Sequence, residues 1–296
     1  MKAVILCGGR GTRLREHTET RPKPMVEIGG RPILWHIMKI YARFGVTDFV
    51  LCLGYLGHVV KDYFLNFQAR NSDLTIELGS RRRVKYHSRP TSEDRWTVTL
   101  ADTGEETQTG ARLSRVREYL DDETFALTYG DGVADIDLDA ALAFHRRHGR
   151  AATVTGVQPP GRFGELVNER ERVVSFSEKP RARSGLINGG FFLLEPRFLD
   201  YVADDPECVL ERAPLERCAQ AGELYVYEHR GFWQCVDTYR DWEHLDTRMR
   251  EGRTPWLASD AAMSSDASAF RPNAAQFAPS QVNMSSRADA PTHAEV

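Results

Sequence analysis

A long hydrophobic run is missing from this 296-residue sequence, and its absence argues against a membrane span. No stretch approaches the ~18 consecutive apolar residues that a transmembrane helix needs. The apolar run near the start, residues 3–7, is also too short for the core of a secretory signal peptide. We therefore expect a cytoplasmic protein that has no membrane partner.

A surplus of positive charge is missing too. The chain carries 39 Lys and Arg against 42 Asp and Glu, a formal charge of -3, whereas a protein that mainly binds nucleic acid needs a basic excess. We therefore expect no nucleic-acid partner, and we interpret the basic run 81–85 as a solvated or interface strand. A small phosphorylated ligand is compatible with this charge, because it needs only a local basic site.

Paired metal-ligand motifs are the third absence. The five cysteines are scattered and include no CxxC pair, so a thiolate zinc site is not expected. His145 and His148 lie three residues apart on an expected helix but have no acidic or cysteine partner nearby in the sequence. We therefore interpret both histidines as surface residues.

Composition divides the chain into a folded part and a tail. Residues 257–296 are rich in Ala, Ser, Asp, Asn and Pro and lack a periodic apolar pattern, so they offer too little apolar surface to offset the entropy of ordering. The preceding residues are enough for one large α/β domain with a single core. We predict one domain over residues 1–256 and a disordered tail over residues 257–296.

The folded part alternates strand-like and helix-like segments. The expected strands are 3–7, 48–53, 74–78, 97–101, 125–128 and 151–157, and the expected helices are 32–44, 57–67, 111–120 and 138–148. This βαβ alternation predicts a Rossmann-like, mostly parallel sheet with helices on both faces. The shorter strand-like segments of residues 161–227 predict a mixed sheet that completes a ligand cleft.

A glycine-rich turn after the first strand is the strongest functional signal. The segment Leu6-Cys7-Gly8-Gly9-Arg10-Gly11-Thr12-Arg13-Leu14 is followed by Pro22-Lys23-Pro24. Glycines let backbone N–H groups approach phosphate oxygens, and Arg13 and Lys23 supply positive charge beside them. No Gly-Lys-Ser/Thr follows, so it is not a Walker loop, and Leu14 stands at the third glycine position of a dinucleotide fingerprint. We interpret the segment as a phosphate cradle rather than a tight turn with solvated cations.

Three weaker motifs have both a functional and a purely structural interpretation. Asp131, in Tyr129-Gly130-Asp131-Gly132, follows an apolar strand and could hold Mg2+ beside a triphosphate, although such an aspartate is more often a turn residue. Glu178-Lys179 could be a solvated ion pair. Thr109 is a natural helix cap. None of these motifs identifies a function by itself.

Taken in order, the motifs resemble the sugar-1-phosphate nucleotidyltransferases, and within them the glucose-1-phosphate cytidylyltransferases. Further matching segments are Trp35-His36-Ile37-Met38, Val133-Ala134-Asp135, Pro159-Pro160-Gly161-Arg162-Phe163-Gly164, Asn188-Gly189-Gly190-Phe191-Phe192 and Gly231-Phe232-Trp233-Gln234 leading to Asp237-Thr238. The likeness is collinear over residues 1–256. It implies the nucleotide-diphospho-sugar transferase fold, CTP and α-D-glucose 1-phosphate as substrates, CDP-glucose and pyrophosphate as products, Mg2+ as cofactor and a homohexamer. It also implies sugar-nucleotide biosynthesis of the kind that supplies lipopolysaccharide O-antigen.

The resemblance further implies a role for individual residues. Lys23, Arg13 and Asp131 would be catalytic, and Asp131 and Asp237 would hold the metal. The nucleotide would be bound by Leu6, Gly8, Gly9, Gly11, Thr12, Arg13, Lys23, Thr109, Arg112 and Gly130. The sugar phosphate would be bound by Gly164, Glu178, Lys179, Asn188 and Gly189. The sequence departs from the family pattern at residues 105–108, in a loop that the family uses near the nucleotide.

A few residues help to distinguish the expected function from the alternatives. The same chemistry with UTP, dTTP or another sugar stays open, because spacing alone does not decode nucleobase or sugar choice. A non-catalytic binding protein of this fold would be expected to lack Lys23, Asp131 or Asp237, and all three are present. A nicotinamide dehydrogenase is disfavoured by Leu14 and by Pro22-Lys23-Pro24.

Overall fold

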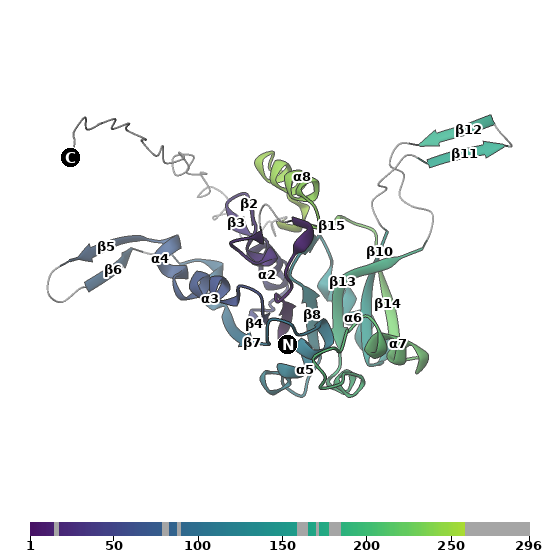
Figure 1. Ribbon diagram of the computed structural model, residues 1–296, viewed down its shortest axis with the longest axis horizontal. Helices are drawn as coiled ribbons and strands as arrows, with labels where there is room; N and C mark the ends of the chain where they lie inside the picture. Colours follow the sequence, from purple (N-terminus) through teal and green to yellow (C-terminus); the bar gives the residue numbers. More distant parts are fainter. Residues whose placement is uncertain are drawn as a thin grey trace, which may run out of the picture.

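A seven-stranded sheet forms the centre of the computed structural model, which describes residues 1–14, 18–78, 83–87, 90–158, 165–169, 172–177 and 185–257 (Figure 1). In spatial order the strands are β14 (Leu224–His229), β10 (Ala152–Val157), β13 (Ile187–Leu194), β8 (Phe125–Tyr129), β1 (Ala3–Leu6), β4 (Asp48–Leu53) and β7 (Thr97–Asp102). Only β13 runs antiparallel to its neighbours. The predicted mostly parallel sheet is therefore confirmed.

Helices cover both faces of this sheet, as the sequence predicts. Alternate side chains of β1 point to opposite faces: Ala3 and Ile5 belong to one buried cluster, and Val4 and Leu6 belong to the other. The first cluster includes α2 (Ile33–Arg43), α6 (Leu138–His148) and α8 (Tyr239–Arg250), and the second includes α5 (Thr109–Arg115) and α7 (Ala213–Gln220). None of the helices within the described residues is long and apolar enough to cross a membrane.

The order of β1 and β8 determines where a site can form. The two strands are parallel neighbours, and Leu6 at the end of β1 is paired with Tyr129 at the end of β8. The glycine-rich turn and Asp131 therefore leave the sheet side by side at its carboxyl edge, where ligands bind in doubly wound folds. A strand register fixed by buried residues thus brings together two motifs that are more than a hundred residues apart in the sequence.

Smaller elements surround the sheet. Two short ladders pair β2 (Glu27–Ile28) with β3 (Arg31–Pro32), and β9 (Gly132–Ala134) with β15 (Trp233–Cys235). Further helices are α3 (Gly57–Leu65) and α4 (Phe67–Asn71), and 3-10 turns cover Thr12–Leu14, Lys23–Met25, Ser92–Arg95, Arg117–Tyr119, Pro196–Tyr201 and Pro255–Leu257.

Two longer hairpins of the described chain also lie outside the central sheet. The strand expected at 74–78 exists as β5 (Asp73–Glu77), but it pairs with β6 (Arg83–His87) in an exposed hairpin that extends away from the sheet (Figure 1). The second hairpin joins β11 (Glu165–Glu169) and β12 (Arg172–Ser177). The mixed pairing expected in the second half comes from β13, which is part of the same central sheet rather than of a separate one.

The histidine interpretation is wrong for His145. This side chain is buried, and its Nε2 lies 2.9 Å from Oε1 of Glu195 while its Nδ1 lies 2.7 Å from Oγ1 of Thr153. Burial lowers the pKa of His145, so the ring is held neutral as part of the core. The partner Glu195 follows β13 and is distant in sequence, which is why no local pattern revealed it.

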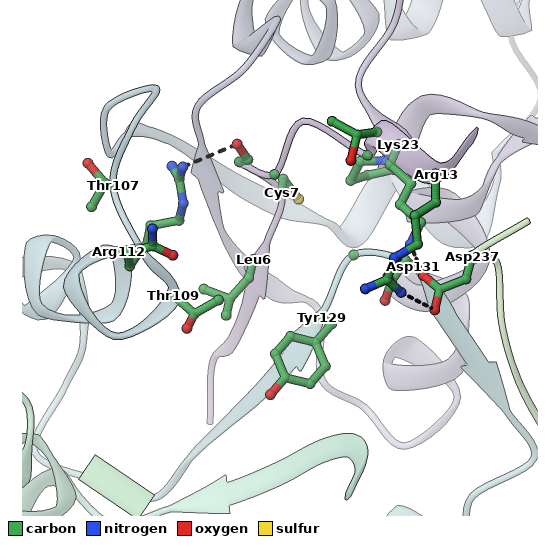
Figure 2. A pocket seen from close by; sticks show the side chains of 17 residues that line it. Leu6, Cys7, Arg13, Lys23, Thr107, Thr109, Arg112, Tyr129, Asp131 and Asp237 are labelled. Atoms are coloured by element: carbon green, nitrogen blue, oxygen red, sulfur yellow. Dashed lines mark hydrogen bonds and ion pairs between the residues drawn. The ribbon is translucent and has the colours of Figure 1, made fainter. Parts of the chain in front are cut away.

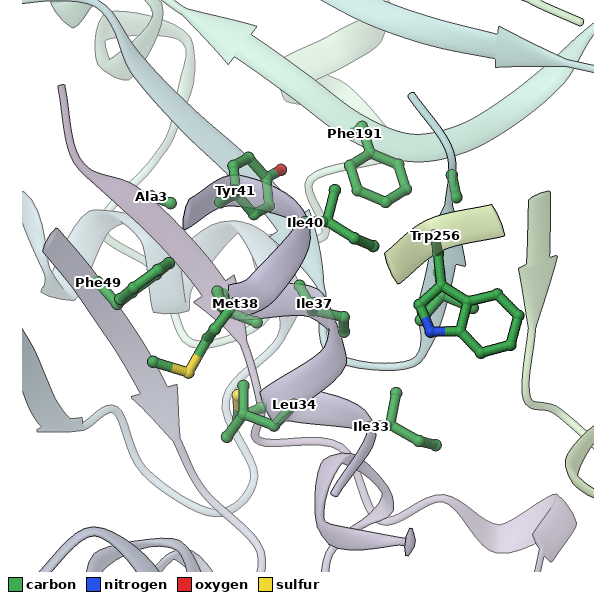
Figure 3. Close-up of a cluster of buried hydrophobic side chains, with 14 of the residues drawn as sticks. Ala3, Ile33, Leu34, Ile37, Met38, Ile40, Tyr41, Phe49, Phe191 and Trp256 are labelled. Atoms are coloured by element: carbon green, nitrogen blue, oxygen red, sulfur yellow. The ribbon is translucent and has the colours of Figure 1, made fainter. Parts of the chain in front are cut away.

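Helix α2 packs its apolar face on the sheet. The last 3-10 turn, Pro255–Leu257, packs against the same cluster of buried side chains (Figure 3). Trp256 in this turn is fully buried. Its Nε1 donates to Nδ1 of His36 at 3.3 Å, and Nε2 of His36 donates to the carbonyl of Ile28 at 2.9 Å. The described chain therefore ends in a docked turn that includes Leu257, whereas residues 258–296, most of the predicted tail, lie outside the described residues.

We expect removal of residues 258–296 to leave activity and thermal stability unchanged, because their composition offers little apolar surface to bury. Trp256→Ala, in contrast, should lower the free energy of unfolding by about 3–5 kcal/mol, because it leaves a cavity against α2. Denaturant unfolding and a turnover assay measure both variants. A large loss of turnover on truncation would show that the tail contributes to the site.

His36 predicts a pH dependence of stability. Burial lowers its pKa to about 4 from the ordinary 6.5, so the unfolded chain takes up a proton first as the pH falls. The stabilising contribution is complete above pH 6.5 and is lost progressively as the pH falls toward 4. From this group alone we expect about 2 kcal/mol less stability at pH ~5 than at pH ~7. Denaturant titrations of His36→Gln should show a smaller loss; an equal loss would contradict the assignment.

Candidate active site

An open cavity of about 460 Å³ lies at the carboxyl ends of β1 and β8 (Figure 2). Every residue predicted to bind the nucleotide lines it: Leu6, Gly8, Gly9, Gly11, Thr12, Arg13, Lys23, Thr109, Arg112 and Gly130. Asp131 and Asp237 line it as well. The structure thus brings the predicted nucleotide residues and the two predicted metal ligands into one cavity.

A second cavity of about 190 Å³ lies next to the first. It is lined by Asn188 and Gly189, two of the residues predicted to bind the sugar phosphate. Tyr129, Asp131 and Asp237 line both cavities, so the two spaces meet at the carboxylates. The other predicted sugar-phosphate residues, Gly164, Glu178 and Lys179, lie outside the described residues.

Four charged side chains form the junction of the cavities. Nζ of Lys23 donates to Oδ2 of Asp131 at 2.6 Å and to Oδ1 of Asp237 at 2.7 Å, and Arg13 donates to Oδ2 of Asp237 at 3.0 Å. Burial of Lys23 would lower its pKa, but the two carboxylates outweigh burial and raise it. Lys23 therefore stays charged. The Arg13 side chain is 76% exposed and so has freedom to follow a ligand.

Backbone geometry explains why Asp131 lies beside the glycine-rich turn. The N–H of Gly130 donates to the carbonyl of Leu6 at 3.0 Å. A Cβ on Gly130 would lie only 2.8 Å from that carbonyl oxygen, so only glycine permits the approach. On the other side, the N–H of Val236 donates to the carbonyl of Asp131 at 2.9 Å, which brings Asp237 into place. Thr238 then caps α8 in a reciprocal capping box with Asp241.

Arg112 is buried, and its guanidinium makes hydrogen bonds to other parts of the protein. It donates to the carbonyls of Gly8, Leu53, Gly104 and Glu105 and to Oγ1 of Thr103, at 2.7–3.1 Å. A Cβ at Gly8 would overlap this guanidinium. Arg112 thus joins the glycine-rich turn to the loop after β7, a role that its cationic character and the family likeness did not suggest.

Other polar contacts at the site were not evident from the sequence. Thr109 is not the cap of α5, since it is the first residue of the helix and its hydroxyl donates to Oε2 of Glu211 at 2.7 Å. Arg10 pairs with Glu105 and Glu106, two of the residues that depart from the family pattern. Trp233 donates to the carbonyl of Gly189 at 2.7 Å and so fixes the wall of the smaller cavity. These partners come from distant segments, so local patterns carried no signal for them.

The donor set fits a divalent cation bound together with a ligand. Among the described residues no group of three or more His, Cys, Asp or Glu side chains could hold a metal by itself. Asp131 and Asp237 are two partly exposed carboxylates, with 30% and 23% of their side chains accessible. Mg2+ is commonly held by one or two carboxylates and completed by phosphate oxygens and water.

Comparison with known proteins shows the family of this chain. Residues 2–243 match the nucleotidyl transferase family. The chain is 51% identical over 257 residues to a glucose-1-phosphate cytidylyltransferase of Salmonella typhi, covering 86% of this chain and 98% of that protein. It is 44% identical over 256 residues to a Bacillus subtilis protein named "Probable glucose-1-phosphate cytidylyltransferase", covering 86% and 99% of the two chains.

A solved structure supports the fold. HddC from Yersinia pseudotuberculosis superposes with a TM-score of 0.61 at 22% identity, covering 84% of this chain and 99% of that one. The chain therefore belongs to the nucleotidyl transferase family. Within that family, the resemblance to glucose-1-phosphate cytidylyltransferases that the motifs indicated is confirmed over most of the chain.

Arg112→Lys tests the structural role of the guanidinium. A lysine cannot reach five acceptors on separate segments, and each buried carbonyl left without a donor destabilises the fold by about 1–3 kcal/mol. We expect a lower melting temperature and an increase in the nucleotide KM on the order of tenfold. Arg117→Lys, at an exposed arginine after α5, is the control. A raised KM with unchanged stability would instead mean that Arg112 contacts the nucleotide directly.

Proposed function

We propose that this enzyme joins CTP and α-D-glucose 1-phosphate to give CDP-glucose and pyrophosphate. The observation that carries the proposal is the meeting of two cavities at Asp131 and Asp237, with Lys23 bound to both carboxylates, because nucleotidyl transfer requires two phosphorylated substrates to meet at one phosphorus atom. The 51% identity to a glucose-1-phosphate cytidylyltransferase supports CTP and glucose 1-phosphate as the pair.

In the proposed reaction, a phosphate oxygen of the sugar phosphate attacks the α-phosphorus of CTP. The bond from that phosphorus to the β-phosphate oxygen breaks, and pyrophosphate leaves from the opposite side. No covalent enzyme intermediate is required. Because both substrates are anions, alignment and charge neutralisation should supply most of the rate enhancement.

Different residues of the chain bind the triphosphate, contact the α-phosphate and stabilise the leaving group. Backbone N–H groups of the turn from Gly8 to Thr12 cradle the triphosphate, which occupies the larger cavity. Lys23 leaves the carboxylates to contact the α-phosphate, where negative charge grows in the transition state. Arg13 stabilises the departing pyrophosphate, since its exposed side chain can follow the leaving group.

Mg2+ is the cofactor that we propose for the two carboxylates. Asp131 and Asp237 would hold it, and both would then exchange Lys23 for the metal as their positive partner. When bound, Mg2+ supplies charge that neutralises the phosphate oxygens and helps to align them. This exchange requires that Lys23 can move, and its four flexible methylenes allow that.

The smaller cavity would hold the sugar phosphate. Asn188 and Gly189 would contact the sugar, and Gly164, Glu178 and Lys179 would complete the site, with Lys179 on the phosphate. We also propose a cytoplasmic homo-oligomer, a hexamer by family likeness. A monomer by light scattering at working concentration, with full activity, would reject the oligomer.

The reaction is tested by pyrophosphate release. Purified enzyme is assayed with each of CTP, UTP, dTTP, ATP and GTP, combined with several sugar 1-phosphates and with or without Mg2+. We expect CTP with glucose 1-phosphate to give the highest kcat/KM. A higher value with another nucleotide or sugar would keep the chemistry and change the substrates, and no release with any pair would reject the function.

Lys23→Ala should reduce turnover by roughly 100-fold or more, on the scale of losing one transition-state donor. CTP affinity should change less, because the turn backbone still binds the triphosphate. The half-saturating Mg2+ concentration should fall, since the metal no longer competes with Lys23 for Asp131 and Asp237. Lys61→Ala on α3, outside both cavities, is the matched control.

Asp131→Asn should behave differently from the lysine variant. Loss of a ligand charge weakens Mg2+ binding, so added Mg2+ should partly restore the rate. Added Mg2+ should not restore Lys23→Ala. An unchanged Mg2+ requirement in Asp131→Asn, measured by titration of initial rates, would remove Asp131 from the metal site.

A further inference from the structure

Glu211, which no sequence motif singled out, lies on a segment that is fixed against the nucleotide side of the site. The N–H of Gln108 donates to the carbonyl of Pro206 at 2.9 Å, and the N–H of Gly110 donates to the carbonyl of Cys208 at 2.9 Å. A Cβ on Gly110 would lie 2.9 Å from that same oxygen, so a glycine is needed for this approach. This segment thereby satisfies the first N–H groups of α5.

The carboxylate of Glu211 connects the two cavities. Its Oε2 accepts from the hydroxyl of Thr109 at 2.7 Å, and its Oε1 accepts from the phenol of Tyr129. The phenol oxygen in turn accepts from Nδ2 of Asn188 at 3.1 Å. A continuous chain of hydrogen bonds therefore runs from Thr109 in the larger cavity to Asn188 in the smaller one.

The direction of these hydrogen bonds is fixed. A carboxylate only accepts hydrogen bonds, so the phenol O–H of Tyr129 is the donor to Glu211. The oxygen of Tyr129 is then free to accept from Asn188. On the other side, Oδ1 of Asn188 accepts from the N–H of Gly190 at 2.8 Å. The Asn188 amide is therefore oriented with its nitrogen toward Tyr129.

A carboxylate at this place is electrostatically unfavourable for the proposed reaction. Both substrates are anions, so removal of a nearby negative charge should by itself strengthen their binding. A passive surface glutamate would therefore raise affinity slightly when truncated. If Glu211 orients other side chains, its truncation should instead lower the affinity for substrate. Whether substrate affinity rises or falls on truncation therefore distinguishes a passive Glu211 from one that orients other side chains.

We propose that Glu211 is a positioning residue for the sugar phosphate: it holds the Tyr129 phenol, and through it the Asn188 amide, in the orientation that binds the sugar. This inference rests on the proposed function. Thr109 depends less on Glu211, because its hydroxyl also accepts from the N–H of Leu210 at 2.9 Å. The effect should therefore fall on the sugar phosphate more than on the nucleotide.

The test compares Glu211→Ala, Glu211→Gln and Tyr129→Phe. We expect the KM for glucose 1-phosphate to rise about tenfold in Glu211→Ala, on the scale of losing hydrogen bonds to a charged group. The KM for CTP should stay within about twofold. Glu211→Gln keeps an acceptor for the phenol and should recover most of the loss. Glu207→Ala, at an exposed carboxylate of the same segment, controls for charge.

A double variant tests whether Glu211 acts through Tyr129. If it does, Glu211→Ala combined with Tyr129→Phe should be no worse than the more severe single variant. The proposal would be overturned if the increases in sugar-phosphate KM were additive in the double variant. It would also be overturned if Glu211→Ala and Glu211→Gln raised this KM equally, or if Glu211→Ala lowered it. Melting temperatures of all variants exclude general unfolding as the cause.

The substrate panel separates this inference from the proposed function. The wild-type protein is assayed first, and the variants are then compared on whichever pair it uses. If wild type prefers another sugar phosphate, the KM for that compound is the readout. If it releases no pyrophosphate, calorimetric titration of glucose 1-phosphate into wild type and Glu211→Ala is the readout, and equal or absent binding in both overturns the inference.

Discussion

Two carboxylates held close together are the constraint on which the rest of the site depends. Asp131 and Asp237 repel each other, and partial burial strengthens that repulsion. The protein offsets it with Lys23 between them and Arg13 beside Asp237. Compensation by cations rather than by burial would let the proposed metal ion take the place of Lys23, because one positive partner can replace another without leaving the carboxylates unpaired.

The sheet makes this arrangement rigid. Val4 and Ile5 of β1 are fully buried, and the parallel register with β8 places the glycine-rich turn next to Asp131. The β9–β15 ladder then brings Asp237 from a third segment. Because each connection consists of backbone hydrogen bonds, the positions of the charged groups do not depend on flexible side chains alone. The backbone of the sheet therefore sets where the two cavities lie relative to each other.

Around this centre, a second set of side chains links the loops. Arg112 joins the glycine-rich turn to the loop after β7, and Arg10 joins it to Glu105 and Glu106. Glu211 connects Thr109 to Tyr129. The loops that surround the larger cavity are thus joined to one another by shared hydrogen-bond and ion-pair partners. The departures at residues 105–108 fit this pattern, since their acidic side chains are paired with a basic residue of the turn.

The sequence by itself determined the fold class and the main chemical groups. Continuous apolar runs ending at glycines marked the buried parallel strands, and Lys23, Asp131 and Asp237 lay in motifs whose residue types already suited phosphate and metal. Tertiary structure alone decided that β5 leaves the sheet, that His145 is buried against Glu195, and that Arg112 and Glu211 serve other side chains. The reason is physical: periodicity and motif chemistry are local, whereas the partner of a buried polar group comes from wherever the folded chain brings one.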